Sequence, residues 1–293
     1  MKILIAGGSG FIGSYLTKRF LQDGHQVNIV SRNAGDISWH EDDLIKALET
    51  TDVLINLAGR SINCRHTSAN KAAIVESRLW AVSKLGCALA KCTRLPHIWI
   101  NASATAIYEG SNSHTNTELD YVPGVGFLAD TVNLWEYTFF SFALPEYRQV
   151  ALRTSVVLGR NGGAFKPLSM LTKLGLGGAV GSGEQLFSWL HIEDYYQAVL
   201  HCVHTDSING SINLSSPKPL PQAHLMSVFR RAMHVPLGLP APDFVVKLGA
   251  FFIRTEASLL LDPVNVFPKI LLDNGFEFKY PDAQSAIQNL LNK

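Results

Sequence analysis

Short apolar runs alternate with longer amphipathic stretches through the first half of the chain. Five runs have the length and apolar content of buried β-strands, at residues 2–6, 26–31, 52–57, 96–103 and 149–158. Four intervening stretches carry apolar residues at helical spacing, at residues 11–23, 42–49, 70–91 and 125–143. Because helices that cross between parallel strands cover both faces of the sheet, this alternation predicts an α/β fold with a doubly wound parallel sheet.

The organisation changes after about residue 158. Glycine-rich loops follow at 159–163 and 175–183, prolines gather between 217 and 242, and an amphipathic helix is expected at 282–291. We therefore expect an N-terminal domain over residues 1–158 and a smaller C-terminal substrate lobe over residues 159–293. Two further apolar segments, 187–191 and 211–214, are expected to return as strands to the main sheet, so that residues 187–214 rejoin the first domain.

Composition and charge narrow the range of partners. The chain has 293 residues, 47% of them hydrophobic and 17% charged, so it can bury a large core. A net charge of +1 argues against nucleic-acid binding, which normally needs a basic face. No apolar run reaches the roughly 18 residues of a membrane span, and the N-terminal run is too short for an export signal. The four cysteines are few and lack metal-binding spacing, so we expect a cytoplasmic protein without a metal site. We expect its partner to be a small-molecule substrate.

A glycine-rich loop at residues 7–13, G-G-S-G-F-I-G, is the strongest chemical signal in the chain. It follows one predicted strand and opens one predicted helix. Gly7 permits the sharp turn, Gly10 lets the backbone approach a pyrophosphate, and Gly13 lets the helix pack close to the strand. The phosphates would bind to the free N–H groups of the helix N-terminus. The loop therefore predicts a dinucleotide site in a Rossmann-type domain, the alternative being a glycine-rich turn without a ligand.

The end of the second predicted strand indicates which dinucleotide is bound. In NAD-binding domains this strand is followed by an acid that holds the ribose 2′-hydroxyl. This chain has Ser31 and Arg32 there, 19 residues beyond Gly13. Because a guanidinium offers forked donors to a phosphate, we predict NADP(H) in preference to NAD. The alternative is that Arg32 is only a solvated surface charge.

Further motifs carry a family resemblance. The glycine loop, N-L-A-G at 56–59 and S-A-T at 103–105 resemble the short-chain dehydrogenase/reductase superfamily, extended type. The likeness extends through L-R-T at 152–154, V-L-G at 157–159 and W-L-H-I-E-D at 189–194. Five further motifs narrow the resemblance to one group within the superfamily: S-R at 77–78, W-E at 135–136, L-G-G at 176–178, G-S-G at 181–183 and P-K-I-L-L-D-N-G-F-E-F-K-Y-P at 268–281. The whole looks like the atypical epimerase-family group (NAD(P)-dependent epimerase/dehydratase-like, short-chain family 39U type).

The resemblance implies a set of cofactor contacts. They come from the glycine loop, the end of the second strand and the turn after the third strand: Gly7, Gly10, Phe11, Ile12, Gly13, Ser31, Arg32, Leu57, Ala58 and Gly59. Arg78 would reach the cofactor phosphates or ribose, or else form an ion pair on its helix surface. Backbone groups of residues 155–157, Val157 among them, would meet the nicotinamide carboxamide. A homodimer formed through the two long helices is also implied.

The catalytic set of the superfamily is incomplete in this chain. Its members use a serine with a Tyr-x-x-x-Lys pair, whose spacing puts both side chains on one helix face. Ser103 fits the serine position, but the helix that should carry the pair has Phe127 and Thr131 instead. Tyr108, five residues past Ser103, is the best substitute, although a phenol without a neighbouring cation is a poor proton donor. Ser103 and Tyr108 are therefore the catalytic candidates, Tyr108 being alternatively an aromatic residue that lines the substrate.

Two other polar residues look structural rather than catalytic. His191 and Asp194 would meet as a dyad only if a helical turn began between them. We expect His191 to be a hydrogen-bonded structural histidine and Asp194 to be the N-cap of the helix that follows.

Two functions of different classes fit these observations. The first is an NADP(H)-dependent oxidoreductase or epimerase-like enzyme acting on a small polar substrate with a non-standard proton donor. The second is a catalytically weak NADP(H)-binding protein that senses redox state or regulates a partner. The glycine loop favours both, the missing Tyr and Lys favour the second, and the retained Ser103 favours the first.

Overall fold

Six parallel strands form the central sheet of the molecule. The computed structural model describes residues 1–32, 36–246 and 256–292. The strands lie in the order β10-β5-β4-β3-β1-β2. Their bounds are β1 Lys2–Ala6, β2 Gln26–Val30, β3 Val53–Asn56, β4 Ile98–Ala104, β5 Arg148–Thr154 and β10 Gly210–Leu214. All five pairings are parallel, so every carboxyl end lies at the same edge of the sheet.

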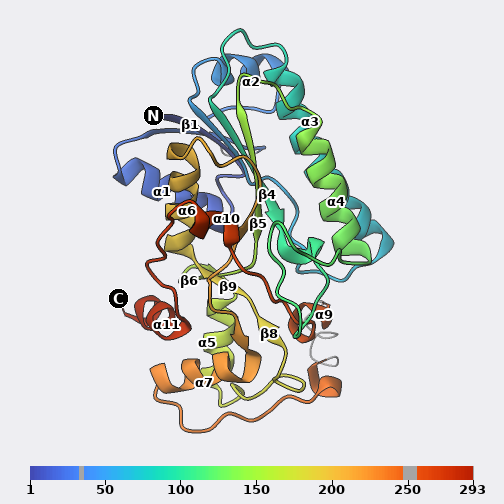
Figure 1. Ribbon diagram of the computed structural model, residues 1–293, viewed down its shortest axis with the longest axis vertical. Helices are drawn as coiled ribbons and strands as arrows, with labels where there is room; N and C mark the ends of the chain where they lie inside the picture. Colours follow the sequence, from blue (N-terminus) through green and yellow to red (C-terminus); the bar gives the residue numbers. More distant parts are fainter. Residues whose placement is uncertain (33–35, 247–255, 293) are drawn as a thin grey trace.

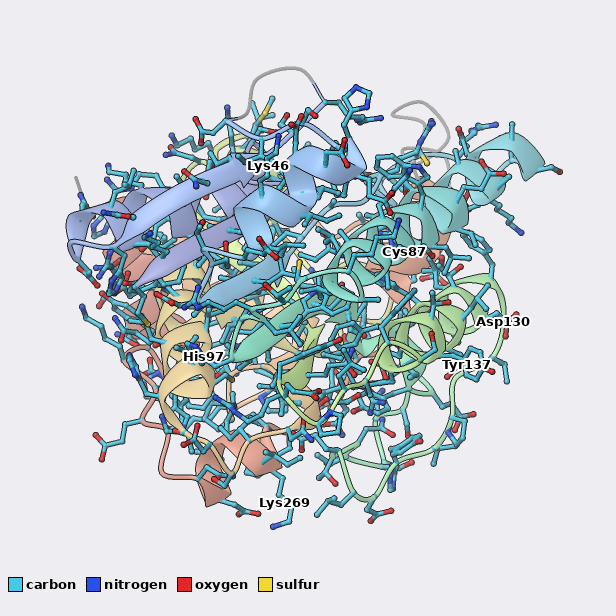
Figure 2. All side chains as sticks on the ribbon, turned by 90° about the horizontal axis from the view of Figure 1, so that it is seen from above. Lys46, Cys87, His97, Asp130, Tyr137 and Lys269 are labelled. Carbon is cyan, nitrogen blue, oxygen red and sulfur yellow. The ribbon has the colours of Figure 1, made fainter. Side chains whose placement is uncertain are left out.

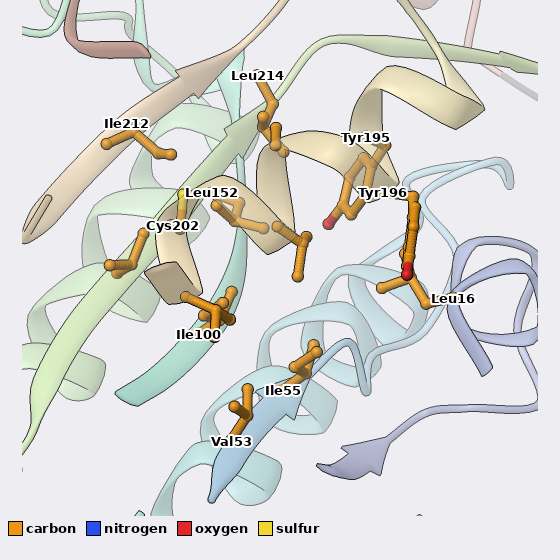
Figure 3. Close-up of a cluster of buried hydrophobic side chains, with 14 of the residues drawn as sticks. Leu16, Val53, Ile55, Ile100, Leu152, Tyr195, Tyr196, Cys202, Ile212 and Leu214 are labelled. Carbon is orange, nitrogen blue, oxygen red and sulfur yellow. The ribbon is translucent and has the colours of Figure 1, made fainter. Parts of the chain in front are cut away.

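Helices cover both faces of this sheet, as the apolar character of its strands requires. On one face lie α1 (Phe11–Gln22) and α6 (Ile192–His204), whose buried side chains pack against alternate strand residues (Figure 3). On the other lie α2 (Glu41–Leu48), α3 (Ser68–Leu89) and α4 (Phe127–Phe140). The core shown in Figure 3 includes Leu16 of α1 and Tyr195 of α6 around Ile55 of β3. The sheet is thus doubly wound, and its carboxyl edge is left open for a site.

A smaller lobe lies beyond this carboxyl edge (Figure 1). Its strands are β6 (Val156–Gly159), β7 (Gly162–Gly163) and β9 (Trp189–His191) in one sheet, and β8 (Leu186–Phe187) with β11 (Leu220–Pro221) in another. Its helices include α5 (Phe165–Lys173), α7 (Gln222–Ala232), α9 (Ser258–Leu261) and α11 (Ala283–Leu291). The lobe has its own core, in which Trp189, Phe229 and Ile287 are buried. The short elements η1 (Thr105–Ile107) and α10 (Lys269–Asp273) complete the described chain.

Most predicted elements of the first half are confirmed, with ends that move by a few residues. The predicted strand at 149–158 is wrong as a single element, because the chain breaks into β5 and β6 at Ser155. There the Ser155 N–H and hydroxyl both donate to the Leu214 carbonyl, and the Val156 N–H turns to the Ser188 carbonyl. Of the two segments expected to rejoin the main sheet, 211–214 does so as β10. The expectation for 187–191 is wrong, since β9 pairs with β6 in the lobe.

Within residues 1–32, 36–246 and 256–292, no helix combines the length and the apolar character that crossing a membrane would require.

Candidate functional site

The glycine loop folds so tightly that a side chain would collide with backbone atoms at two of its positions. Gly7 has φ +81°, and a Cβ there would lie 2.8 Å from the backbone nitrogen of Ala58. A Cβ on Gly13 would lie 2.3 Å from the carbonyl oxygen of Gly7. Gly10 is the N-cap of α1 and makes no side-chain cap. The first-turn N–H groups of Phe11, Ile12 and Gly13 therefore face the open edge, where they can bind an anion.

Phe11 joins this loop to the C-terminal lobe. Its ring lies against the β6–β7 turn, where a Cβ would come within 2.6 Å of the ring at Gly159 and 2.4 Å at Gly162. The glycines at 159–163 are thus needed for close packing of an aromatic ring, a reason that the sequence pattern did not reveal. Val157, at the start of this hairpin, is buried, and its carbonyl oxygen accepts from the Ala164 N–H.

Two buried asparagines hold the turn after β3. The Asn56 side-chain oxygen accepts from the Ala58 N–H at 3.1 Å, and its Nδ2 donates to Asn101 Oδ1 at 2.7 Å. Both asparagines are at most 1% exposed. They fix the turn 57–59 beside the glycine loop, where Leu57 and Ala58 are half-buried and Gly59 is exposed.

Arg78 reaches from α3 to this same turn. Its Nη1 donates to the carbonyl oxygens of Arg60 and Ile74 at 3.0 and 2.9 Å, and its guanidinium carbon lies 5.0 Å from the centre of the Trp135 ring. Burial lowers the pKa of Arg78 to about 10. In the described part of the chain no carboxylate pairs with it. The surface ion pair considered as an alternative is therefore not formed, and the positive charge is held next to Gly59.

The two residues predicted to choose the dinucleotide lie at the carboxyl end of β2. The Ser31 N–H donates to the Ile37 carbonyl at 3.3 Å. Arg32 is exposed to solvent at the same edge as the glycine loop.

Ser103 and Tyr108, the catalytic candidates, lie in one buried polar network. The Ser103 hydroxyl donates to Glu136 at 2.5 Å, and Arg153 makes two hydrogen bonds to the same carboxylate, at 2.9 and 2.7 Å. The Tyr108 hydroxyl accepts from Arg153 Nη1 at 2.9 Å and donates to Asn213 Oδ1 at 2.7 Å. Each of these five residues is at most 7% exposed. The network links α4 to β4, β5 and β10 at the carboxyl edge.

The charges in this network do not turn Tyr108 into a ready proton donor. Burial raises the pKa of Tyr108 to about 12, although the adjacent Arg153 acts in the opposite direction. Burial alone would lower the pKa of Arg153, but the hydrogen bonds and charge of Glu136 outweigh it and leave that pKa raised. Sequence reasoning missed the ion pair between Glu136 and Arg153. Its one signal was a charged residue, Arg153, next to the apolar run 150–152 of β5.

Phe127 begins α4, at the position where the sequence resemblance implies a tyrosine in other members. One turn later, the Thr131 hydroxyl donates to the Phe127 carbonyl at 2.6 Å, so it is turned along its own helix. The Phe127 ring contacts two side chains of another segment. The His66 ring centre lies 5.2 Å away, and the Lys71 ammonium lies 5.1 Å from the ring centre.

His191 has a structural role, and the expected role of Asp194 is wrong. His191 itself is the N-cap of α6, with Nδ1 accepting from the Glu193 N–H at 3.0 Å. The helix therefore begins three residues earlier than the sequence suggested. Asp194 lies inside the first turn and accepts from the N–H groups of Lys279 and Tyr280, which the sequence places far away.

The N-cap at His191 predicts a pH-dependent stability. Burial lowers the pKa of His191 to about 4, whereas an unfolded histidine titrates near 6.5. Between these values the unfolded state binds the extra proton, so stability contributed by neutral His191 is lost as the pH falls from 6.5 to 4. The loss amounts to about 3 kcal/mol. Asp194, whose pKa burial raises to about 6, acts in the opposite direction. Urea unfolding of the wild type and of His191→Asn, which keeps a capping side chain, should therefore differ in pH slope across this range; equal slopes would contradict the assignment.

Comparison with known proteins adds a family and several relatives. The model of the NAD dependent epimerase/dehydratase family matches residues 3–215, and that of a domain of unknown function, DUF1731, matches residues 241–290. Epimerase family protein SDR39U1 of Bos taurus is 34% identical, over 99% of this chain and all of its own length. Epimerase family protein YfhF of Bacillus subtilis is 33% identical, over 99% of this chain and 98% of its own.

Solved structures show the same likeness. Human epimerase family protein SDR39U1 (isoform 2), crystallised with NADPH, superposes with a TM-score of 0.90 at 32% identity, covering 99% of each chain. A nucleoside-diphosphate sugar epimerase from Corynebacterium glutamicum superposes with a TM-score of 0.80 at 26% identity, over 99% of this chain and 58% of its own. The UDP-glucose 4-epimerase of Thermotoga maritima gives 0.76 at 16% identity, which bears on the fold alone.

Proposed function

Because the chain belongs to the NAD dependent epimerase/dehydratase family, we propose that it binds NADPH and acts as an oxidoreductase or epimerase-like enzyme on a small polar substrate. The observation that carries the proposal is the open, tightly folded glycine loop with exposed Arg32 beside it. NADPH bound by a 32% identical relative supports the choice of cofactor.

The residues present fit this cofactor. The first turn of α1 would hold the pyrophosphate, Ser31 and Arg32 the 2′-phosphate, and Leu57, Ala58 and Gly59 the adenosine ribose. Arg78, half-buried beside Gly59 and without a carboxylate partner among the described residues, would gain an anionic neighbour when phosphates bind. Phe11 and Val157 would line the nicotinamide end. When bound, NADPH supplies a hydride.

The experiment that tests the proposal is turnover of NADPH or NADP⁺ with a panel of carbonyl compounds and nucleotide sugars. Substrate-dependent oxidation or reduction of the cofactor, followed at 340 nm, supports an enzyme. The incomplete catalytic set favours the second candidate function, a cofactor-binding sensor. Tight NADPH binding without turnover across the panel would support that candidate and contradict the enzyme.

Ser103 remains a candidate for proton transfer, whereas we expect Tyr108 to be a structural member of the buried network, and Tyr108→Phe tests this. Because the phenol is buried and its pKa is raised to about 12, we expect turnover to be unchanged within about twofold. We expect a loss of roughly 1–3 kcal/mol in the free energy of unfolding, since Asn213 and Arg153 each lose a hydrogen-bond partner. A fall in the turnover number of a hundredfold at full cofactor affinity would instead place Tyr108 in the chemistry.

A homodimer is part of the proposal. Leu134 and Tyr137 of α4 are 43% and 77% exposed, and Figure 2 shows Tyr137 projecting from the outer side of this helix. Burial of these side chains between two copies would remove apolar surface from water. We expect sedimentation velocity to detect a dimer that Tyr137→Glu weakens at least tenfold, because burying an unpaired carboxylate is strongly unfavourable. A monomer at all concentrations would contradict the dimer.

A further inference from the structure

A corner of the open edge is formed where α3 and α4 begin. We call it the α3–α4 corner and define it by residues 60–71 and Phe127. The loop that enters it starts at the turn beside the glycine loop, where a Cβ on Gly59 would lie 3.4 Å from Cγ of Arg78. On its other side the His66 N–H donates to the Glu256 carboxylate at 2.7 Å, so the C-terminal lobe reaches it as well. The α3–α4 corner therefore lies between the proposed cofactor site and the lobe.

Positive charge is concentrated in this corner. Residues 57–71 contain three basic residues, Arg60, Arg65 and Lys71, and no acidic one. No ion pair between described residues includes Arg60 or Lys71. Two acids are close to the corner: Asp130 follows Phe127 by three residues in α4, and the Glu256 carboxylate accepts from the His66 N–H. The long helix α3 adds the positive end of its dipole, which begins at the N-cap Thr67.

Lys71 is a cation of this corner that forms no ion pair with another described residue. Its ammonium lies 5.1 Å from the centre of the Phe127 ring, in a cation–π contact that uses the charge and none of its three N–H donors. Arg60 is held differently, since its Nη2 donates to the Asn70 side-chain oxygen at 2.8 Å. Lys71 is thus placed on an aromatic surface with donors left for a ligand.

Lys71 supplies positive charge at the α3–α4 corner, next to the proposed cofactor site. Phe127 begins α4, a helix whose residues include no lysine or arginine. The cation at this corner instead comes from α3. A carboxylate of the chain itself, that of Glu256, already approaches the same corner.

We infer that the substrate carries an oxyanion group, a carboxylate or a phosphate, and that Lys71 binds this group against the Phe127 ring. The inference rests on the proposed function and specifies the substrate class of the same site. Ammonium-to-oxyanion hydrogen bonds are among the stronger ones in proteins, and the apolar ring limits competing water. Arg60 and the N-terminal end of α3 add a longer-range attraction.

The test uses the protein saturated with NADPH, so that phosphate cannot bind at the cofactor site. Inorganic phosphate and malonate are titrated separately by calorimetry at constant ionic strength, which distinguishes a phosphate from a carboxylate preference. We expect Lys71→Gln to weaken binding of the preferred anion by roughly tenfold or more, and Lys71→Arg to retain it. Lys84→Gln, which removes an exposed charge from the same helix, is the matched control and should change the affinity by less than about twofold. Glu256→Gln, which removes the competing carboxylate, should tighten binding by about threefold.

Two results would overturn the inference. One is an NADPH-loaded protein that binds neither anion. The other is a Lys71→Gln variant, folded and NADPH-bound, whose affinity for both anions equals that of the wild type. Absence of NADPH binding in the loading step is a separate result, because it overturns the proposed function itself and the inference with it.

Discussion

Replacing Glu136 with alanine is expected to lower the free energy of unfolding by about 3–5 kcal/mol. The carboxylate is 6% exposed and accepts hydrogen bonds from Ser103, Arg153 and Ser211. Its loss leaves the guanidinium of Arg153, itself 7% exposed, buried without a counter-charge. Breaking a buried ion pair from one side is far more costly than the pair is worth, because the remaining charge cannot return to water.

Urea unfolding followed by circular dichroism measures this loss. Glu76→Ala is the matched control, since it makes the same change at an exposed position of helix α3 and should cost less than about 0.5 kcal/mol. The double variant Glu136→Leu/Arg153→Met removes both charges and should recover most of the loss. A decrease below about 1 kcal/mol for Glu136→Ala would show that the network does not stabilise this edge of the sheet.

Arg32→Asp is expected to reverse the cofactor preference. A guanidinium that binds the 2′-phosphate with charge-assisted hydrogen bonds contributes roughly 1.5–3 kcal/mol to binding. Its loss should therefore lower the affinity for NADPH about 10- to 150-fold. Aspartate at this place would also repel the phosphate while accepting from the ribose 2′-hydroxyl of NADH. NADH affinity should therefore stay the same or improve.

Competitive titration of the variant with both nucleotides checks this result. Lys46→Asp makes the same charge change at an exposed position of α2 and controls for long-range electrostatics (Figure 2). We expect Lys46→Asp to lower the affinity for NADPH by no more than about twofold. If Arg32→Asp and Lys46→Asp have equal effects, Arg32 is only a surface charge.

The elements of the fold that depend on local pattern could be predicted from the sequence. The run of β1, glycine loop, α1 and β2 is specified by residues close in the chain, and its predicted ends hold within one residue. The break at Ser155 and the pairing of β9 with β6 could not be predicted, because both depend on partners more than 30 residues away. Asp194 fits an N-cap locally, yet the backbone of Lys279 and Tyr280 determines its role.

In the candidate site, too, the residues with a local sequence pattern could be predicted and the contacts between distant segments could not. The cofactor residues were accessible to prediction, because the glycine loop and Arg32 have a local spacing that the chemistry requires. The ion pair of Glu136 with Arg153 and the contact of Lys71 with Phe127 join separate helices and strands. Neither has a spacing that a single sequence displays, so each needed the structure.

Calorimetric titration of the nucleotide-free protein with NADPH and with NADH tests the central claim most directly. NADPH should bind at least about tenfold more tightly than NADH, since the glycine loop serves both nucleotides and Arg32 only one. Failure of the folded, empty protein to bind either nucleotide would contradict the cofactor site, and equal affinities would contradict the role of Arg32.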